Sequence, residues 1–249
     1  MMTSSEVLRE FLLAFADDEH LMGQQHTEWI GVTPFLEEDL AFASIGQDEL
    51  GHAVLLYELV CELDGVEPTD AAIDALAFGR GANEYRSSAF TEYGTTDWAE
   101  ALVRHWIYDL VEDQRWQLVA GSSHAALASA AVRAQREETY HRRHAQALMD
   151  SLIATPARAE LEAGLVVVLP KLPSLFVAVA NEDVLISNGV VSEPLASRTT
   201  LIVEQISAMF PGSDLDEVPS HGRVVRSDDF APLMLRMREV LDLDPAAVW

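Results

Sequence analysis

Two short motifs in this 249-residue chain each place a glutamate three residues before a histidine. Glu49 precedes His52, Glu138 precedes His141, and each pair lies in a stretch with helical periodicity. Three residues turn an α-helix by about 300°, so both side chains of a pair leave the same face. Two such helices, each packed beside another carboxylate-bearing helix, carry the ligands of di-iron and di-manganese four-helix bundles. The motifs therefore favour an all-α bundle around two metal ions, and the alternative at this point is a pair of solvated glutamates beside ordinary helix histidines.

The order of helical segments along the chain supports a four-helix bundle. Four long stretches have apolar residues at the helical period and are separated by turns that contain glycine. These stretches cover residues 5–30, 36–63, 97–119 and 124–153. Residues 66–94, which connect the second stretch to the third, are polar and predict a short helix and a crossing loop. We therefore expect the bundle over about 5–153.

The C-terminal part, about 156–249, predicts additional helices packed on the bundle within a single domain, 1–249. Its valine-rich runs at 165–169 and 175–180 flank two prolines, and both strands and a helix interrupted by proline fit this pattern. We favour one long kinked helix. Two further helices are expected at 194–210 and from about 231 to 243, with a loop between them.

Composition excludes several classes of function. The formal net charge is −25, and Lys171 is the one lysine, so nucleic acid and anionic membranes are disfavoured partners. The chain has no apolar run long enough to span a membrane, and its single cysteine, Cys61, fits a reducing compartment. We therefore expect a cytoplasmic protein. The acidic surface suits either life in high salt or an arginine-favouring codon bias with a specialised acidic face.

Each of the four predicted bundle helices carries a candidate metal ligand. In chain order these are Glu28, then Glu49 with His52, then Asp109 or Glu112, then Glu138 with His141. Burying four carboxylates would cost a prohibitive amount of free energy unless cations balanced their negative charge. Carboxylate oxygens and imidazole nitrogens are suitable ligands for iron or manganese. The alternative is a polar network in which some carboxylates face solvent or pair with arginines. We expect His105 to be a core residue and His144 to lie at the surface.

No phosphate-binding loop stands out, so flavin or NAD binding by this chain is not expected. Electrons for any oxygen chemistry would then have to come from a separate reductase. A ferritin-like metal oxidase, or a metal store, is a further possibility that would need no organic substrate.

Several segments resemble the phenylacetyl-CoA oxygenase subunit family (PaaA/PaaC). The likeness extends over most of the chain. The length of the chain and the short connection from Glu28-Trp29 to Glu49 are closer to PaaC than to PaaA. The segments that carry it are Gln47-Asp48-Glu49-Leu50-Gly51-His52, Glu138-Thr139-Tyr140-His141, Trp106-Ile107-Tyr108-Asp109, His221-Gly222-Arg223 and Asp228-Asp229-Phe230-Ala231-Pro232-Leu233.

The resemblance implies a ferritin-like fold and membership of a multicomponent oxygenase that epoxidises the ring of an aryl-CoA thioester. The family's ligand pattern, which uses Asp in the third helix and so favours Asp109, falls on Glu28, Glu49, His52, Asp109, Glu138 and His141. PaaC-type subunits commonly lack several of these ligands and dock a catalytic PaaA-type homologue. The resemblance therefore implies either an oxygenase with its own two iron ions, manganese being possible, or a non-catalytic structural subunit. In both cases the partner is a homologous subunit or a second copy of this chain.

Overall fold

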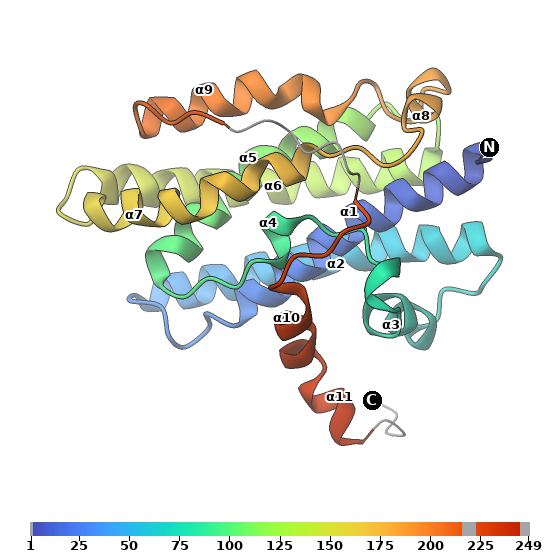
Figure 1. Ribbon diagram of the computed structural model, residues 1–249, viewed down its shortest axis with the longest axis horizontal. Coiled ribbons are helices and arrows are strands. Elements are labelled where there is room, and N and C mark those ends of the chain that lie inside the picture. Colours follow the sequence, from blue (N-terminus) through green and yellow to red (C-terminus); the bar gives the residue numbers. More distant parts are fainter. Residues whose placement is uncertain (1, 216–222, 245–249) are drawn as a thin grey trace.

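The computed structural model describes residues 2–215 and 223–244, and these residues form helices and connecting turns without a β-strand. The predicted all-α, ferritin-like fold is confirmed. Four long helices close to the predicted stretches make up the bundle (Figure 1): α1 (Ser4–Thr27), α2 (Leu36–Asp64), α5 (Trp98–Val119) and α6 (Ala125–Ile153).

Local sequence signals explain where several of these helices begin and end. Before α1, the Thr3 side chain accepts from the Glu6 backbone N–H, and the Glu6 carboxylate accepts from that of Thr3. This reciprocal cap satisfies amide groups that have no partner within the helix. Asp97 caps α5 by accepting from the Glu100 N–H at 2.9 Å. Gly65 ends α2 at a positive φ of 69°, a conformation that glycine adopts without strain.

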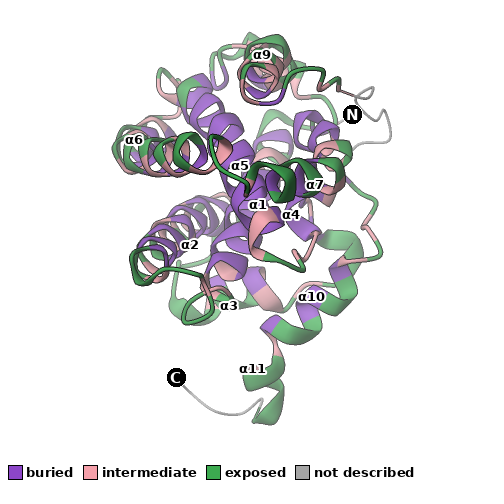
Figure 2. Ribbon diagram, turned by 90° about the vertical axis from the view of Figure 1, so that its left-hand side faces the viewer, coloured by how far each residue is buried: buried purple, intermediate pink, exposed green. Residues whose placement is uncertain are grey.

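The third bundle helix, α5, is covered on all sides. In the end-on view of Figure 2, α1 and α5 lie at the centre, α2 and α6 lie to one side, and α7 and α4 lie to the other. Most residues of α5 are buried, and α6, α7 and α9 all pack against it. Burial around the whole circumference explains why charged residues on α5 must find partners inside the protein.

The segments outside the four long helices form short helices. The connection between α2 and α5 folds into α3 (Asp70–Phe78), η1 (Ala82–Glu84) and α4 (Ala89–Glu92). The first valine-rich run is helical, as favoured: α7 (Arg158–Val168) continues as a 3₁₀-helix, η2 (Leu169–Phe176), which contains both prolines. Residues 177–180 of the second run are not helical, so the helix is shorter than predicted. The remaining elements are α8 (Asp183–Ser187), η3 (Leu195–Arg198), α9 (Thr199–Met209), α10 (Phe230–Met237) and α11 (Glu239–Leu243). His221 and Gly222 lie outside the described residues.

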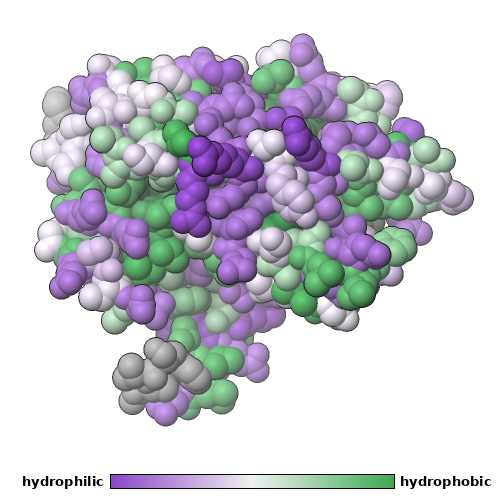
Figure 3. All heavy atoms as spheres, turned by 180° about the vertical axis from the view of Figure 1, so that it is seen from behind, coloured by the Kyte–Doolittle hydropathy of each residue, from purple (hydrophilic) through white to green (hydrophobic). Residues whose placement is uncertain are grey.

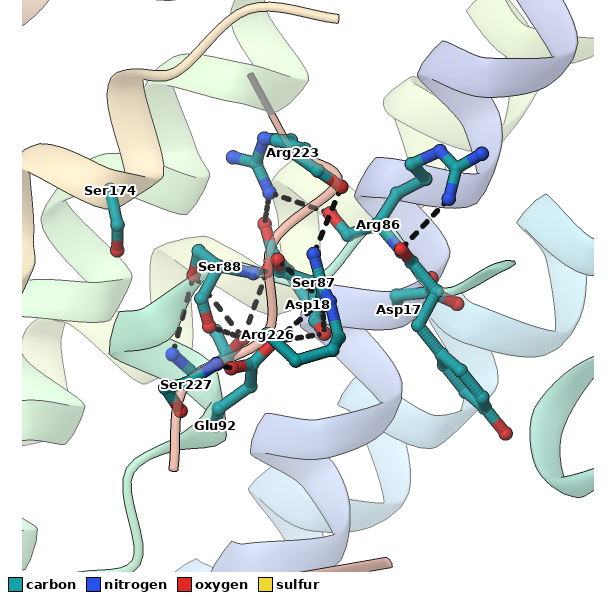
Figure 4. A network of polar contacts seen from close by, with 12 residues as sticks. Asp17, Asp18, Arg86, Ser87, Ser88, Glu92, Ser174, Arg223, Arg226 and Ser227 are labelled. Carbon is teal, nitrogen blue, oxygen red and sulfur yellow. Dashed lines mark hydrogen bonds and ion pairs between the residues drawn. The ribbon is translucent and has the colours of Figure 1, made fainter. Parts of the chain in front are cut away.

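A buried ionic network ties the C-terminal segment to α1 and α5 (Figure 4). Asp18 Oδ2 accepts from Arg115 Nη1 at 2.9 Å and from Arg223 Nη1 at 2.7 Å, and Asp18 Oδ1 accepts from the Ser88 N–H at 2.8 Å. Burial opposes ionisation, but the two guanidinium groups hold the pKa of Asp18 below its ordinary value. The network fixes α1 against α5 and against the segment of chain that follows η1.

The face formed by α2 and α6 is turned toward the viewer in Figure 3 and is largely hydrophilic across its middle. Hydrophobic residues gather toward its two ends, where Leu36, Leu40 and Val132 are among the exposed apolar side chains. Among the described residues, no helix combines the length and the apolar composition that crossing a bilayer requires.

Helices α1 and α2 are in close contact where Gly23 of α1 and Gly46 of α2 face each other. A Cβ atom at Gly23 would lie 2.9 Å from the Glu49 Cβ and 3.0 Å from the Gly46 carbonyl oxygen. Both neighbouring atoms belong to or adjoin the backbone of α2, so the clash could be relieved only by separating the helices. The close approach brings Glu49 toward α1.

Replacing Gly23 by alanine is expected to lower the free energy of unfolding by about 1–3 kcal/mol, because the added methyl group overpacks the contact between α1 and α2. Chemical denaturation measures this loss. Gly51→Ala is the matched control: the nearest atom to its Cβ is Arg133 Nη2 at 3.9 Å, and alanine favours the helix by about 1 kcal/mol. Equal stability of the two variants would contradict the proposed role of Gly23.

Candidate metal centre

Six buried side chains from the four bundle helices converge, and we call them the carboxylate–histidine centre. The exposed fraction of each is 0%. They form two overlapping groups, in each of which the ligand atoms lie within 4.8 Å of one another: Glu19, Glu49, His52 and Glu112, and then Glu49, Glu138 and His141. Because Glu49 belongs to both groups, the two groups make one continuous centre.

The centre lies between two apolar parts of the core. Toward one end of the bundle, Phe15 of α1 and Trp116 of α5 belong to one hydrophobic cluster. Toward the other end, Met22 of α1 and Tyr108 of α5 belong to a second cluster. Glu19 falls between Phe15 and Met22 along α1. The polar groups of the centre are therefore surrounded by apolar packing, where uncompensated charge is costly.

Each histidine of the centre is held from outside by the acid that precedes the glutamate of the other motif. His52 Nε2 lies 2.8 Å from Glu137 Oε2, and His141 Nε2 lies 3.3 Å from Asp48 Oδ2. These acids are partly exposed, with side-chain exposures of 24% and 31%. An outer carboxylate fixes the orientation of a ring and leaves the other nitrogen free to bind a metal.

The inner nitrogens face the carboxylates. His52 Nδ1 lies 3.3 Å from Glu112 Oε1 and 3.4 Å from Glu19 Oε2, and His141 Nδ1 lies 3.2 Å from Glu138 Oε1. Two carboxylates have their own supporting donors. The Tyr108 hydroxyl donates to Glu19 Oε1 at 3.0 Å, and the Trp116 indole N–H donates to Glu112 Oε1 at 3.0 Å.

The other six carboxylate oxygens of the centre have no hydrogen-bond partner among the described residues. This holds for both oxygens of Glu49, both oxygens of Glu138 and one oxygen each of Glu19 and Glu112. Buried acceptors without donors are rare in folded proteins because each forfeits its hydration. Carboxylate oxygen and imidazole nitrogen are suitable ligands for divalent iron or manganese. The residues present therefore fit a metal centre.

Burial and mutual repulsion shift the pKa values of these acids. Burial and the charge of Glu112 raise the pKa of Glu49 and of Glu138 well above the ordinary range, and they raise that of Glu19 to about 8. His52 shifts in the same direction: although burial opposes it, hydrogen bonds to Glu112 and Glu137 raise its pKa. Without metal, the centre therefore retains protons that a bound cation would displace.

The structure does not bring Glu28, one of the predicted ligands, to the centre. Glu28 follows the last residue of α1, its side chain is 37% exposed, and its Oε1 lies 3.3 Å from Arg236 Nε. Glu19 lies nine residues earlier, about 13 Å along the helix axis, and faces His52 instead. Its signal in the sequence is the spacing from Leu12 and Phe15, which places Glu19 on the apolar face of α1.

Asp109 also lies outside the carboxylate–histidine centre, to which α5 contributes Glu112. Asp109 is 1% exposed, and its Oδ1 lies 3.1 Å from His105 Nδ1 on the same helix. Burial raises its pKa well above the ordinary range. Asp109 and Glu112 are three residues apart and share one face of α5, so spacing alone leaves both open. The other four predicted residues, Glu49, His52, Glu138 and His141, come together in the centre.

Comparison with known proteins identifies the family to which the chain belongs. A model for the family described as "Phenylacetic acid catabolic protein" matches residues 2–216. The C subunit of 1,2-phenylacetyl-CoA epoxidase from Escherichia coli (strain K12) is 28% identical over 145 residues, which cover 58% of this chain and 57% of that relative. The aligned part is thus a little over half of each protein. Because the family model spans most of the sequence, the chain belongs to the phenylacetic acid catabolic protein (PaaA/PaaC) family.

Proposed function

We propose that this chain is an oxygenase subunit that binds two iron ions through Glu19, Glu49, His52, Glu112, Glu138 and His141, with manganese as the alternative metal. One observation carries the proposal: buried carboxylate oxygens from four helices face one another without hydrogen-bond donors among the described residues. Glu49 lies in both ligand groups and is the natural bridge between two ions. Two divalent ions would balance the four negative charges.

Bound iron would supply the activation of dioxygen, for which protein side chains alone have no chemistry. The chain's own residues prepare the site for it. Glu137 and Asp48 orient the two imidazoles, while Tyr108 and Trp116 restrain Glu19 and Glu112 from the apolar side. Glu49 and Glu138 have no such restraint among the described residues, so their carboxylates are free to change position as ligands bind.

The substrate class follows from the relative named as part of a phenylacetyl-CoA epoxidase. The proposed reaction joins an aryl-CoA thioester, O2, two electrons and two protons to give the ring epoxide and water. The electrons come from a separate reductase. A second protein of the same family, or a second copy of this chain, is the expected partner. The alternative is a non-catalytic structural subunit, and the relative's designation as one subunit of an epoxidase gives that alternative its support.

The first prediction concerns metal content. Full-length protein supplied with Fe²⁺ during expression is expected to bind about two ions per chain. Glu49→Ala and Glu138→Ala should each empty the site, because the remaining carboxylates cannot hold two cations close together. Glu28→Ala is the matched control and should retain both ions, because its side chain lies at the surface. Elemental analysis gives the answer. Loss of metal in the Glu28 variant, or retention in both others, would contradict this ligand set.

The second prediction concerns pH and metal-free protein. Glu19, Glu49 and Glu138 have raised pKa values in the folded state, so the folded protein holds protons that the unfolded chain releases above about pH 4.5. Stability should therefore fall as pH rises from about 5 to 8, by up to about 1.4 kcal/mol per pH unit for each such carboxyl. Thermal denaturation across this range measures the slope.

Two comparisons make the pH prediction specific. Glu138→Gln removes one titrating carboxyl, so it should raise the melting temperature of the metal-free protein at pH 8 and flatten the slope. Saturating metal should abolish or reverse the slope, because metal binding requires deprotonated ligands. A variant less stable than the wild type at pH 8 would show that Glu138 is paired with a cation.

The third prediction concerns turnover. Iron-loaded protein with a reductase and phenylacetyl-CoA, assayed with and without a PaaA-type subunit, should yield a product one oxygen atom heavier. Mass spectrometry detects it. The Glu138→Ala variant is the control and should yield none. Product that depends on the PaaA-type subunit but is equal for the wild type and Glu138→Ala would establish the structural-subunit alternative.

A further inference from the structure

Three more histidines, two of them buried and one half-buried, lie beside the carboxylate–histidine centre, toward the N-terminal end of α2. His26 of α1 and His105 of α5 pack edge to face, with ring centroids 4.9 Å apart. His144 of α6 follows, with its ring centroid 6.2 Å from that of His105. His26 and His105 are 1% and 0% exposed. They contribute no ligand atom to the two groups described above.

The nitrogens of these rings lack ordinary partners. Among the described residues, neither nitrogen of His26 or His105 makes a hydrogen bond, and neither does Nδ1 of His144. A neutral imidazole carries one N–H donor and one acceptor, so each fully buried ring leaves both kinds of group unused. Buried polar groups of this kind are usually satisfied by internal water. The cluster is thus a polar passage within an apolar core.

The outer end of this passage reaches the protein surface. His144 Nε2 lies 3.1 Å from Glu38 Oε2, and the side chains of His144 and Glu38 are 17% and 9% exposed. Tyr140, which is 51% exposed, stacks on the His144 ring with centroids 6.2 Å apart. A proton from bulk water can therefore reach His144 directly or through Glu38.

The inner end of the passage reaches the carboxylate–histidine centre. His105 Nδ1 lies 3.1 Å from Asp109 Oδ1, and both oxygens of Asp109 lack hydrogen-bond partners among the described residues. Asp109 lies one turn before Glu112 on α5. Residues three apart share one face of a helix, so the Asp109 carboxyl lies on the side of α5 from which Glu112 enters the centre.

We propose that Glu38, His144, His105 and Asp109 form a proton path that connects solvent to the carboxylate–histidine centre. The purpose of the path rests on the proposed function, since the epoxidation consumes two protons for each O2. At each ring a proton arrives on one nitrogen and another leaves from the second, so no net charge stays in the core. The ring centroids of His105 and His144 are 6.2 Å apart, a separation that one bridging water would span.

Both histidines of the path are suited to this transfer because they are neutral at pH 7. Burial, together with the nearby His141, lowers the pKa of His105 to about 3, and burial with His105 lowers that of His144 to about 4. A neutral ring both accepts and donates. The titratable groups around the two rings are His26 from α1, Glu38 from α2, Arg104, Asp109 and Glu112 from α5, and Tyr140 and His141 from α6.

Proton exchange at the ring of His105 tests the path without any oxygen chemistry. The full chain, labelled with ¹⁵N-histidine and supplied with diamagnetic Zn²⁺, is studied by NMR, which measures exchange of ring N–H protons with water. His105 should exchange at least about tenfold faster than His20, although both are deeply buried. His20 is the internal reference because it faces Tyr57 and Phe78 instead of the path.

Two substitutions of His144 then interrupt the path. His144→Phe should slow exchange at His105 about tenfold and leave His20 unchanged. His144→Gln keeps a polar group beside Glu38 but cannot pass a proton between two ring nitrogens, so it should slow exchange at His105 equally. It is the second variant in case phenylalanine disturbs the packing at this position. Exchange at His105 that matches the wild type in both variants, or that is as slow as at His20 in the wild type, would overturn the proposal.

A kinetic arm separates this inference from the proposed function. If the iron-loaded protein turns over aryl-CoA, His144→Ala should lower kcat about tenfold or more with KM unchanged, and added imidazole should restore kcat. A variant with a merely distorted structure would not respond to imidazole. If no turnover is found at all, the exchange experiment still decides whether the path exists, because it needs no catalysis.

Discussion

Desolvation of carboxylates in the middle of the bundle is the constraint on which the rest of this structure depends. Three consecutive acids of α1 show how it is met. Asp17 pairs with Arg80, and Asp18 pairs with Arg115 and Arg223. Among the described residues no arginine or lysine lies within ion-pair distance of Glu19, whose charged neighbour is His52. The chain has only 16 basic residues against 41 acidic ones, and these three arginines pair with acids outside the centre.

The helices and the two Glu-x-x-His pairs were predictable because both depend on short-range spacing. Apolar periodicity locates a helix and its buried face, and a three-residue step fixes which side chains share that face. This is why Glu49, His52, Glu138 and His141 were placed correctly beside one another. Spacing did not decide the valine-rich segment in the same way, because strands and an interrupted helix fitted it equally; in the structure the first run continues through the prolines as a 3₁₀-helix that ends at Phe176.

The sequence did not predict in the same way which acid along a helix lies level with the centre. Glu28 and Glu19 are both acids of one amphipathic segment, and only the antiparallel packing of α1 on α2, set by the close contact at Gly23 and Gly46, places Glu19 opposite His52. Asp109 and Glu112 share one face of α5, and three-dimensional packing alone separates a residue that reaches His52 from one that reaches His105. Long-range packing therefore decides which of these acids reach the centre.

The crossed pairing of each histidine with the acid of the opposite motif relates the α1–α2 hairpin to the α5–α6 hairpin. The two halves are not chemically equal, however. Glu137 reaches His52 at 2.8 Å and also contacts Arg133, whereas the shorter Asp48 side chain leaves 3.3 Å to His141. A shorter contact with a carboxylate makes an imidazole a stronger electron donor through its other nitrogen. Two identical ions bound through these imidazoles would therefore be held by unequal nitrogen donors, so the two halves of the centre would differ even without a difference in metal.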